Sequence, residues 1–285
     1  MLFDFRPKVA IHCWGGLGSQ LYAWALRLDL ESTYPSRKFF FVTHEAGVTQ
    51  RFSELSLFFP ASTNVVPDYS DSLFPSDIRP VSIDLKNKIR SLITRMLYKC
   101  KFLVDGDCVD PVRQLKGWSF QIRGHYSYRK ISSKAISSIL ETLIEHEPSI
   151  KSNGAIPVAL HYRLGDLQIL TEKRPLDLQR IIHTLGKIPN IGQSPIHLYS
   201  DSLAVAQSLL NDAGFSYSDT SESSLISTLL ELAGSSVFIG SNSKISVWSV
   251  IFKSHSNIDS LSFLPIEVKH HSIANIGESL QITYY

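Results

Sequence analysis

Residues 9–30 read VAIHCWGGLGSQLYAWALRLDL, and this stretch decides the fold class. Val9–Cys13 is a short apolar run typical of a buried strand, and Ser19–Leu30 is a largely apolar run long enough for a helix. The glycine-rich segment 15–18 joins the two runs, and Phe39–Thr43 adds a second strand. The order strand, glycine turn, helix, strand predicts the beginning of a parallel α/β sheet.

The second half of the chain alternates between strand and helix signals. Strands are predicted at Pro157–Tyr162, Ile196–Tyr199, Ser216–Ser218, Val237–Ile239 and Ser260–Leu264, and helices at Leu176–Leu185, Leu203–Ala213, Ser224–Ala233 and Lys244–Phe252. This alternation predicts a second doubly wound parallel sheet, so the fold class is α/β with two Rossmann-like domains. We place the domains at 1–152 and 153–285, with a linker at Ser152–Gly154 and a ligand cleft between them.

Three further stretches complete the organisation. The proline-punctuated segment Val48–Pro80 is expected to be an irregular insertion, and Ser132–Glu145 is expected to be a helix. The stretch between Lys86 and Lys130 holds eleven Lys/Arg and three Asp/Glu, although the net charge of the chain is only +2. Within it, residues 85–102 form a basic amphipathic segment, which is either a surface helix covering the core or a helix on an anionic membrane. It contains no nucleic-acid-binding module.

Composition narrows the class of protein. The 285 residues are 44% hydrophobic and 19% charged, which suits a globular protein with a sizeable core. The three cysteines have no metal-ligand spacing, and their small odd number argues against an oxidising compartment. We see no secretory signal and no apolar run of about 18 residues that would span a membrane. The expectation is a cytoplasmic protein.

Polar residues gather where the predicted strands end. Gly15–Gln20 follows the first strand, and glycines before a helix start allow close approach of an anion, although such a turn is often only a tight turn. His161–Asp166 follows another strand; Arg163 is suited to grip a diphosphate, or it forms a local ion pair with Asp166. Asp201 either caps the next helix or contacts a base or ribose, and Gly240–Ser243 is either an anion cradle or a helix cap.

Together these segments resemble the bacterial α1,2-fucosyltransferase family, within the fucosyltransferase superfamily. Residues 15–23 (GGLGSQLYA) are similar to the family's GGLGNQ and following helix, and residues 161–166 (HYRLGD) are similar to its HxRRGD segment. Residues 199–202 (YSDS) resemble the family's FSDD, and residues 242–252 (NSKISVWSVIF) resemble its NSSFSWWGAWL. A weaker likeness to GYWQSEKYF lies at Gly124–Tyr128.

The resemblance implies a GT-B-like architecture and an inverting, metal-independent transfer of fucose from GDP-fucose, with no cofactor. The first domain would then be the acceptor side and the second the nucleotide-sugar-binding side. The implied catalytic residues are Arg163, Asp166 and Ser19, and the implied donor-binding residues are Gly16, Gly18, Gln20, His161, Arg163, Asp201, Ser241, Asn242, Ser243 and Ser246. Arg163 would hold the β-phosphate, and His161 would contact the guanine side. His12 and His125 are lesser candidates for the general base.

The sequence departs from the family pattern at a few positions, which keeps alternatives open. Ser19 stands where the family has Asn, Leu164 replaces its second Arg, and Val247 replaces the first Trp of its Trp pair. A different nucleotide-sugar donor, or a nucleotide-sugar-binding protein without catalysis, therefore remains an alternative. The implied partners are a nucleotide sugar and a glycan acceptor, either free or lipid-linked, in bacterial O-antigen or capsule synthesis. Peripheral contact with the inner membrane is expected, and nucleic acid is not.

Overall fold

The computed structural model describes residues 7–45, 52–67, 85–108, 110–148, 156–163, 178–189, 191, 195–219, 224–256, 260–272, 275 and 280–285. The chain divides into two compact units, Met1–Ala135 (unit 1) and Ile136–Tyr285 (unit 2). The predicted linker, and with it the predicted boundary at 152/153, lies outside the described residues.

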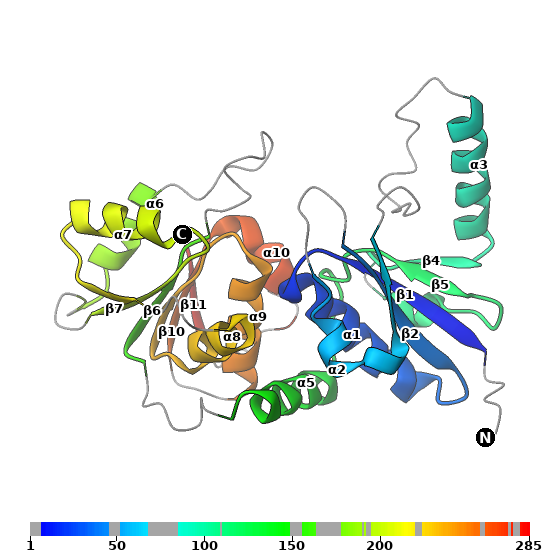
Figure 1. Cartoon of the computed structure of the whole chain (residues 1–285), viewed down its shortest axis with the longest axis horizontal. Helices are drawn as coiled ribbons and strands as arrows, with labels where there is room; N and C mark the ends of the chain where they lie inside the picture. Colours follow the sequence, from blue (N-terminus) through cyan, green and yellow to red (C-terminus); the bar gives the residue numbers. More distant parts are fainter. Residues whose placement is uncertain are drawn as a thin grey trace. The chain divides into compact units, whose positions relative to one another are not determined.

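Unit 1 is built on a five-stranded sheet of order β3-β2-β1-β5-β4, in which all neighbouring strands are parallel (Figure 1). Its strands are β1 (Lys8–Trp14), β2 (Lys38–His44), β3 (Thr63–Val66), β4 (Leu103–Asp105) and β5 (Gln121–Arg123). Its helices are α1 (Leu17–Thr33), α2 (Leu55–Phe58), the 3-10 turn η1 (Pro60–Ser62), α3 (Leu85–Lys99) and α4 (Pro111–Gln114). The strand–glycine–helix–strand prediction is confirmed by β1, α1 and β2.

Three strands of unit 1 were not predicted, and each has a physical reason. β4 and β5 have three residues each, too few to show an apolar period. β3 lies within Val48–Pro80, so the expectation of a purely irregular insertion there is wrong for residues 55–66. β3 is an edge strand whose two central residues, Asn64 and Val65, are exposed, which leaves no alternation to detect.

Unit 2 is built on a six-stranded parallel sheet of order β11-β10-β9-β6-β7-β8. Its strands are β6 (Val158–His161), β7 (Ile196–Tyr199), β8 (Tyr217–Asp219), β9 (Val237–Ile239), β10 (Leu261–Leu264) and β11 (Gln281–Tyr284). Its helices are α6 (Leu178–Gly186), α7 (Leu203–Asp212), α8 (Leu225–Gly234), α9 (Lys244–His255), the 3-10 turn η6 (Ile266–Val268) and α10 (Lys269–Ser272). Helix α5 (Ser133–His146) begins just before the division between the units.

The predicted fold class is confirmed, because each unit is an α/β assembly around a parallel sheet. All five strands and all four helices predicted after residue 153 are present, with ends that differ by three residues or fewer. Strand β11 was not predicted, since its residues are half-exposed or exposed at the edge of the sheet. In the core of unit 2, residues of β6, α6 and β7 pack together, including Leu160, Ile181 and Leu198.

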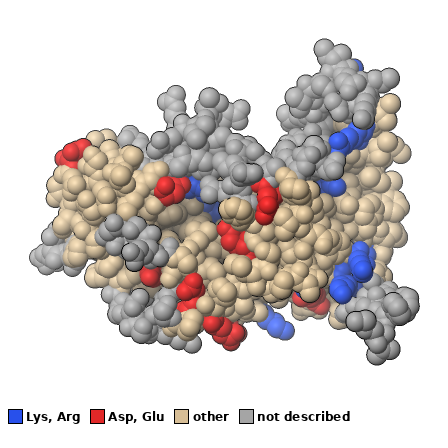
Figure 2. Space-filling view, in the orientation of Figure 1, with Lys and Arg blue, Asp and Glu red and all other residues tan. Residues whose placement is uncertain are grey.

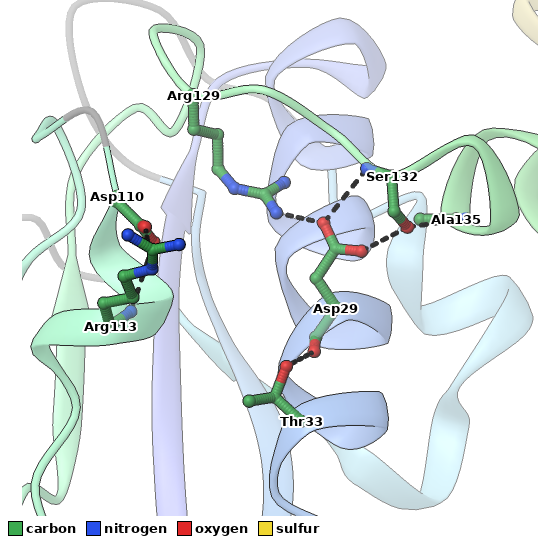
Figure 3. A network of polar contacts seen from close by, with 7 residues as sticks. All are labelled: Asp29, Thr33, Asp110, Arg113, Arg129, Ser132 and Ala135. Carbon is green, nitrogen blue, oxygen red and sulfur yellow. Dashed lines mark hydrogen bonds and ion pairs between the residues drawn. The ribbon is translucent and has the colours of Figure 1, made fainter.

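A buried polar network joins two segments of unit 1 that are far apart in the sequence (Figure 3). Arg129, whose side chain is 3% exposed, forms an ion pair with Asp29 of α1. The Ser132 hydroxyl donates to the same carboxylate and accepts from the Ala135 backbone N–H at 3.1 Å, which caps the start of α5. Thr33 donates to the Asp29 carbonyl at 2.8 Å. The network therefore fastens the segment before α5 onto α1.

A buried lysine stabilises the end of one helix in unit 2. Lys253 of α9 has no exposed surface, and its ammonium donates to the carbonyl of Ser235, which is the C-cap of α8. A cation suits that position because the C-terminal carbonyls of a helix carry partial negative charge. Burial nevertheless lowers the pKa of Lys253 to about 8.

This shift predicts that the protein becomes more stable as the pH rises through the window from about 8 to 10.5. In that window the unfolded lysine still binds a proton that the folded lysine has lost, so the free energy of unfolding increases with pH. Relative to Lys253→Met, the free energy of unfolding of the native protein should increase by up to about 3 kcal/mol across this pH window and should not change below it. Urea unfolding of both proteins at several pH values measures this difference. The exposed Lys187→Met is the control, and a pH-independent difference for Lys253→Met would contradict the prediction.

Candidate functional site

The order of strands in unit 2 reverses at its centre, between β6 and β9. From β6 the chain proceeds to β7 and β8 on one side, and from β9 it proceeds to β10 and β11 on the other. At such a reversal the connections leave the sheet toward opposite faces, and the carboxyl ends of the two central strands border a crevice that binds ligands in open α/β sheets. His161 ends β6, and Gly240 directly follows β9. Predicted site residues therefore stand at the switch point of this sheet.

The loop after β9 approaches its neighbours too closely for a side chain at its first residue. A Cβ atom on Gly240 would lie 2.6 Å from Leu264 Cδ2 and 2.8 Å from Ser246 Cβ. The loop then turns into α9, where Ser243 is the N-cap and its hydroxyl accepts from the Ile245 N–H at 3.2 Å. The capping alternative for Ser243 is thus realised. The N-terminus of α9 carries the partial positive charge of a helix start, which suits an anion.

Ser241 is the unusual residue of this loop. It is 1% exposed, and its hydroxyl is buried without a hydrogen-bond partner among the described residues. Its backbone N–H, in contrast, donates to Ser246 Oγ at 3.0 Å. A buried hydroxyl without a partner costs about 1–3 kcal/mol, so such groups call for an explanation, and a ligand is one.

Ser246 also contacts the strand end on the other side of the switch point. Its hydroxyl lies 2.8 Å from His161 Nδ1. Ser246 Oγ also accepts from the Ser241 N–H at 3.0 Å, so this hydroxyl joins the end of β6 to the loop after β9. Burial, and then the nearby Arg163 charge, lower the pKa of His161 to about 4, so the ring is neutral at pH 7. A neutral imidazole carries one N–H donor and one acceptor nitrogen.

Arg163 and Asp201 bring the ends of β6 and β7 together. Arg163 Nε lies 3.9 Å from Asp201 Oδ2, and the two side chains are 28% and 38% exposed. Helix α7 begins after Ser202, which is its N-cap, so Asp201 is not the capping residue. Asp166 and Leu164 lie outside the described residues, and the predicted roles of both, including an Arg163–Asp166 pair, stay predictions.

A residue that the sequence did not single out supports this loop. The hydroxyl of Tyr285 donates to the Gly240 carbonyl at 2.7 Å. Tyr285 directly follows β11 and is 45 residues from Gly240 in the sequence. No local sequence pattern predicts this contact, because the contact forms only when β11 pairs with the rest of the sheet.

The glycine loop of unit 1 has the backbone that its sequence suggests. Gly15 has φ +79°, a region that other residues rarely adopt, and Gly16 is the N-cap of α1. A Cβ atom on Gly15 would lie 3.1 Å from Ser19 Oγ, and Gly18 is buried in the first turn of α1. This loop follows β1, which is the central strand of the five-stranded sheet and lies between β2 and β5.

Gln20 has a structural role that the sequence did not predict. Its amide donates to the carbonyls of Gly15 and Phe52, each at 2.9 Å, and to Glu54 Oε2 at 2.6 Å. Its carbonyl accepts from the Leu55 N–H at 3.0 Å. Gln20 therefore ties the glycine loop to the start of α2, and its predicted contact with a donor stays a prediction.

The two histidines proposed as lesser base candidates differ in their surroundings. His12 stacks within a group formed with Trp14 and His44, and its Nδ1 lies 2.9 Å from His44 Nε2. Burial, Arg123 and His44 lower the pKa of His12 to about 3, which makes it a weak base. His125 is exposed, and its backbone N–H donates to Asp107 at 2.5 Å.

The described residues contain neither a cluster of metal ligands nor a membrane-spanning helix. Among the described residues there is no group of three or more His, Cys, Asp or Glu side chains that could hold a metal ion. Within the same ranges, no helix is both long and apolar enough to cross a bilayer.

Comparisons with known proteins give similarity at the level of structure. No protein-family profile matches the chain. No curated protein sequence matches it either. Among solved structures, the chain is similar to an E. coli heptosyltransferase WaaC with ADP, at 13% identity and a TM-score of 0.46, covering 97% of this chain and 93% of that one.

Two further solved structures are similar to this chain. POFUT1 in complex with GDP is 12% identical with a TM-score of 0.41, covering 91% of this chain and 98% of that one. NodZ α-1,6-fucosyltransferase soaked with GDP-fucose is 15% identical with a TM-score of 0.39, covering 85% and 91%. At these identities the likeness concerns the fold and assigns no activity to this chain.

Proposed function

We propose that this chain is a glycosyltransferase that moves a sugar from a nucleoside diphosphate onto a hydroxyl of a glycan acceptor. The observation that carries the proposal is the hydroxyl of Ser241, which is buried without a partner among the described residues, at the switch point and before the N-terminus of α9. Helix N-termini and hydroxyl groups are suited to phosphate oxygens. Arg163, at the end of the neighbouring strand β6, adds a guanidinium that can hold a diphosphate.

The proposed reaction is a single in-line displacement with inversion. The acceptor oxygen forms a bond to the anomeric carbon while the bond from that carbon to the diphosphate oxygen breaks. The electron pair and negative charge pass to the nucleoside diphosphate, where Arg163 and the N–H groups at the start of α9 would stabilise them without a metal ion. The hydroxyl proton passes to a general base, for which Asp166 is our first candidate.

The donor and acceptor are proposed from the resemblance of the motifs. GDP-fucose is the first choice of donor, His161 would contact the guanine side, and Asp201 would accept from the base or the ribose. The α1,2 linkage and an acceptor in bacterial surface polysaccharide follow from the same resemblance. Because Ser19 and Leu164 depart from the motifs, another nucleotide-sugar donor is the second candidate.

Ser241→Ala tests the proposal at the residue that carries it. Without ligand, the variant should unfold at the same temperature as the native protein or slightly above, since no hydrogen bond within the described residues is lost. With a nucleoside diphosphate bound, it should lose a hydrogen bond to a charged group, and binding should weaken about 10- to 100-fold. Thermal shift and calorimetry with GDP, ADP and UDP measure both quantities, because ligand binding raises apparent stability.

Ser262→Ala is the matched control, because the Ser262 hydroxyl of β10 is also buried without a partner within the described residues but belongs to a strand interior. It should leave nucleotide binding unchanged. Stabilisation by GDP above ADP and UDP would favour GDP-fucose, and preference for another nucleotide would favour the second candidate. If none of the three nucleotides binds the native protein, the proposed function is wrong. Binding without donor hydrolysis or transfer would identify a pure nucleotide-sugar-binding protein.

A further inference from the structure

Helix α3 of unit 1 exposes its apolar side and buries polar residues. Ile89, Leu92, Ile93 and Met96 are between 50% and 59% exposed, whereas Ser91 and Thr94 are buried. Positions three and four apart lie on one face of a helix, so the exposed apolar residues form a continuous stripe. The expectation that this stripe covers the core is therefore wrong, because the stripe is exposed. Figure 1 shows α3 (teal) extending away from the strands of its unit.

The charges of α3 all have one sign. Its fifteen residues include five Lys or Arg and no Asp or Glu. At about 100° per residue, Lys88, Arg95 and Lys99 line one edge of the apolar stripe. Figure 2 shows blue Lys and Arg atoms among tan atoms in the part of unit 1 that α3 occupies in Figure 1. The stripe is thus apolar at its centre and basic along its edge.

Exposed aromatic rings continue this surface beyond the C-terminus of α3. Phe102 and Phe120 are exposed, and their ring centroids lie 6.2 Å apart. Trp118 is 59% exposed, and its indole N–H donates to the Cys100 carbonyl, one residue past α3, at 2.9 Å. Large aromatic residues beside an amphipathic helix are enriched where proteins meet the headgroup region of a bilayer.

We propose that this face of unit 1, made of the α3 stripe and the aromatic residues Phe102, Trp118 and Phe120, docks on an anionic phospholipid surface. The helix would lie in the plane of the interface, with its stripe among the acyl chains and its lysines at the headgroups. The uniform positive charge selects an anionic surface, because a neutral one offers no partner for it. The proposal is independent of the proposed function, since vesicle binding needs neither donor nor acceptor.

Vesicle flotation of the full chain tests the proposal. Vesicles of phosphatidylcholine with phosphatidylglycerol should carry the protein, vesicles of phosphatidylcholine alone should not, and added salt should weaken the binding. Trp118 provides a second readout, because Trp14, Trp24 and Trp248 are buried and it is the exposed tryptophan. Its emission should shift to shorter wavelength with the anionic vesicles, and Trp118→Phe should abolish that shift.

Variants of α3 separate the apolar and the electrostatic contributions to vesicle binding. Leu92→Ser with Met96→Ser should weaken partitioning at least about tenfold, because exposed apolar area is removed. Lys88→Gln with Lys99→Gln should weaken it roughly 25-fold, about fivefold for each charge. The exposed Val205→Ser of α7 and Lys187→Gln of unit 2 are the matched controls and should bind as the native protein does. Unchanged melting temperatures would show that every variant is folded.

Three results would overturn the proposal. Equal binding to neutral and anionic vesicles would remove the charge argument, and equal loss in the unit 2 controls would remove the assignment to α3. A native protein that is a dimer, becomes a monomer in Leu92→Ser with Met96→Ser, and binds no vesicle would show that the stripe instead docks on a second copy of the chain.

Discussion

Arg163→Ala is expected to lower sugar transfer by about 10²- to 10³-fold, the range measured when one charge-stabilising donor is removed from an active site. In the proposed mechanism Arg163 neutralises the charge that grows on the leaving nucleoside diphosphate. The melting temperature should change little, because the pair with Asp201 is long, at 3.9 Å, and partly exposed. Steady-state kinetics with the donor identified by the nucleotide panel measure kcat and KM separately.

Two further variants serve for comparison: Arg163→Lys keeps the charge, and Arg113→Ala is a surface control. Lysine keeps the positive charge but lacks the planar fork of arginine, so Arg163→Lys should recover only part of the activity. Arg113 of α4 is 89% exposed, and its replacement should leave the kinetics unchanged. Near-normal turnover in Arg163→Ala, with the chain shown to be active, would exclude Arg163 from the mechanism.

Asp29→Ala is expected to destabilise unit 1 by about 3–5 kcal/mol, which is typical when one partner of a buried ion pair is removed. Arg129 is almost fully buried, so its guanidinium would lose its carboxylate in a place that water does not reach. Ser132, which caps α5, would lose its acceptor at the same time (Figure 3). Urea unfolding of the variant and the native protein gives the difference in the free energy of unfolding.

The same figure offers a matched control on the surface of unit 1. Arg113 pairs with Asp110 at 3.1 Å, but both side chains are largely exposed, so Arg113→Ala should cost no more than about 0.5 kcal/mol. The double variant Asp29→Leu with Arg129→Met removes both charges and should recover much of the stability that Asp29→Ala loses. If Asp29→Ala lowers the free energy of unfolding no more than Arg113→Ala does, the network does not hold α1 to the segment before α5.

The strands and helices that could be predicted are those with a sufficient run of local signal. β7 and β9 begin and end at the predicted residues, because β9 is a continuous apolar run and β7 is apolar at three of its four positions. The three-residue strands β4 and β5 could not be found, since their pairing with β1 and with each other comes from distant parts of the chain. The exposure of the apolar stripe of α3 could not be predicted for a similar reason: burial depends on what packs against a helix, and the periodicity of the helix does not reveal that.

The candidate site also has features that the sequence predicted and features that it did not. The sequence placed His161, Arg163, Asp201 and Ser241–Ser243 at strand ends, because apolar runs that stop at polar residues mark the carboxyl edge of a parallel sheet. It did not show that Gln20 would be fully engaged in holding the segment around Phe52 and Leu55. A glutamine side chain carries both donor and acceptor groups, and only the folded chain determines which groups satisfy them.

The stretch from Val9 to Leu30 by itself determined a strand, a glycine turn and a helix, because local apolar runs and backbone freedom at Gly15 suffice for these. Only the tertiary structure decided that β6 and β9 lie side by side and that Ser246 joins His161 to Ser241. It also decided that the Ser241 hydroxyl is buried without a partner within the described residues. The physical reason is that hydrogen bonds and burial depend on contacts between residues about 80 positions apart, such as His161 and Ser246, which no local pattern encodes.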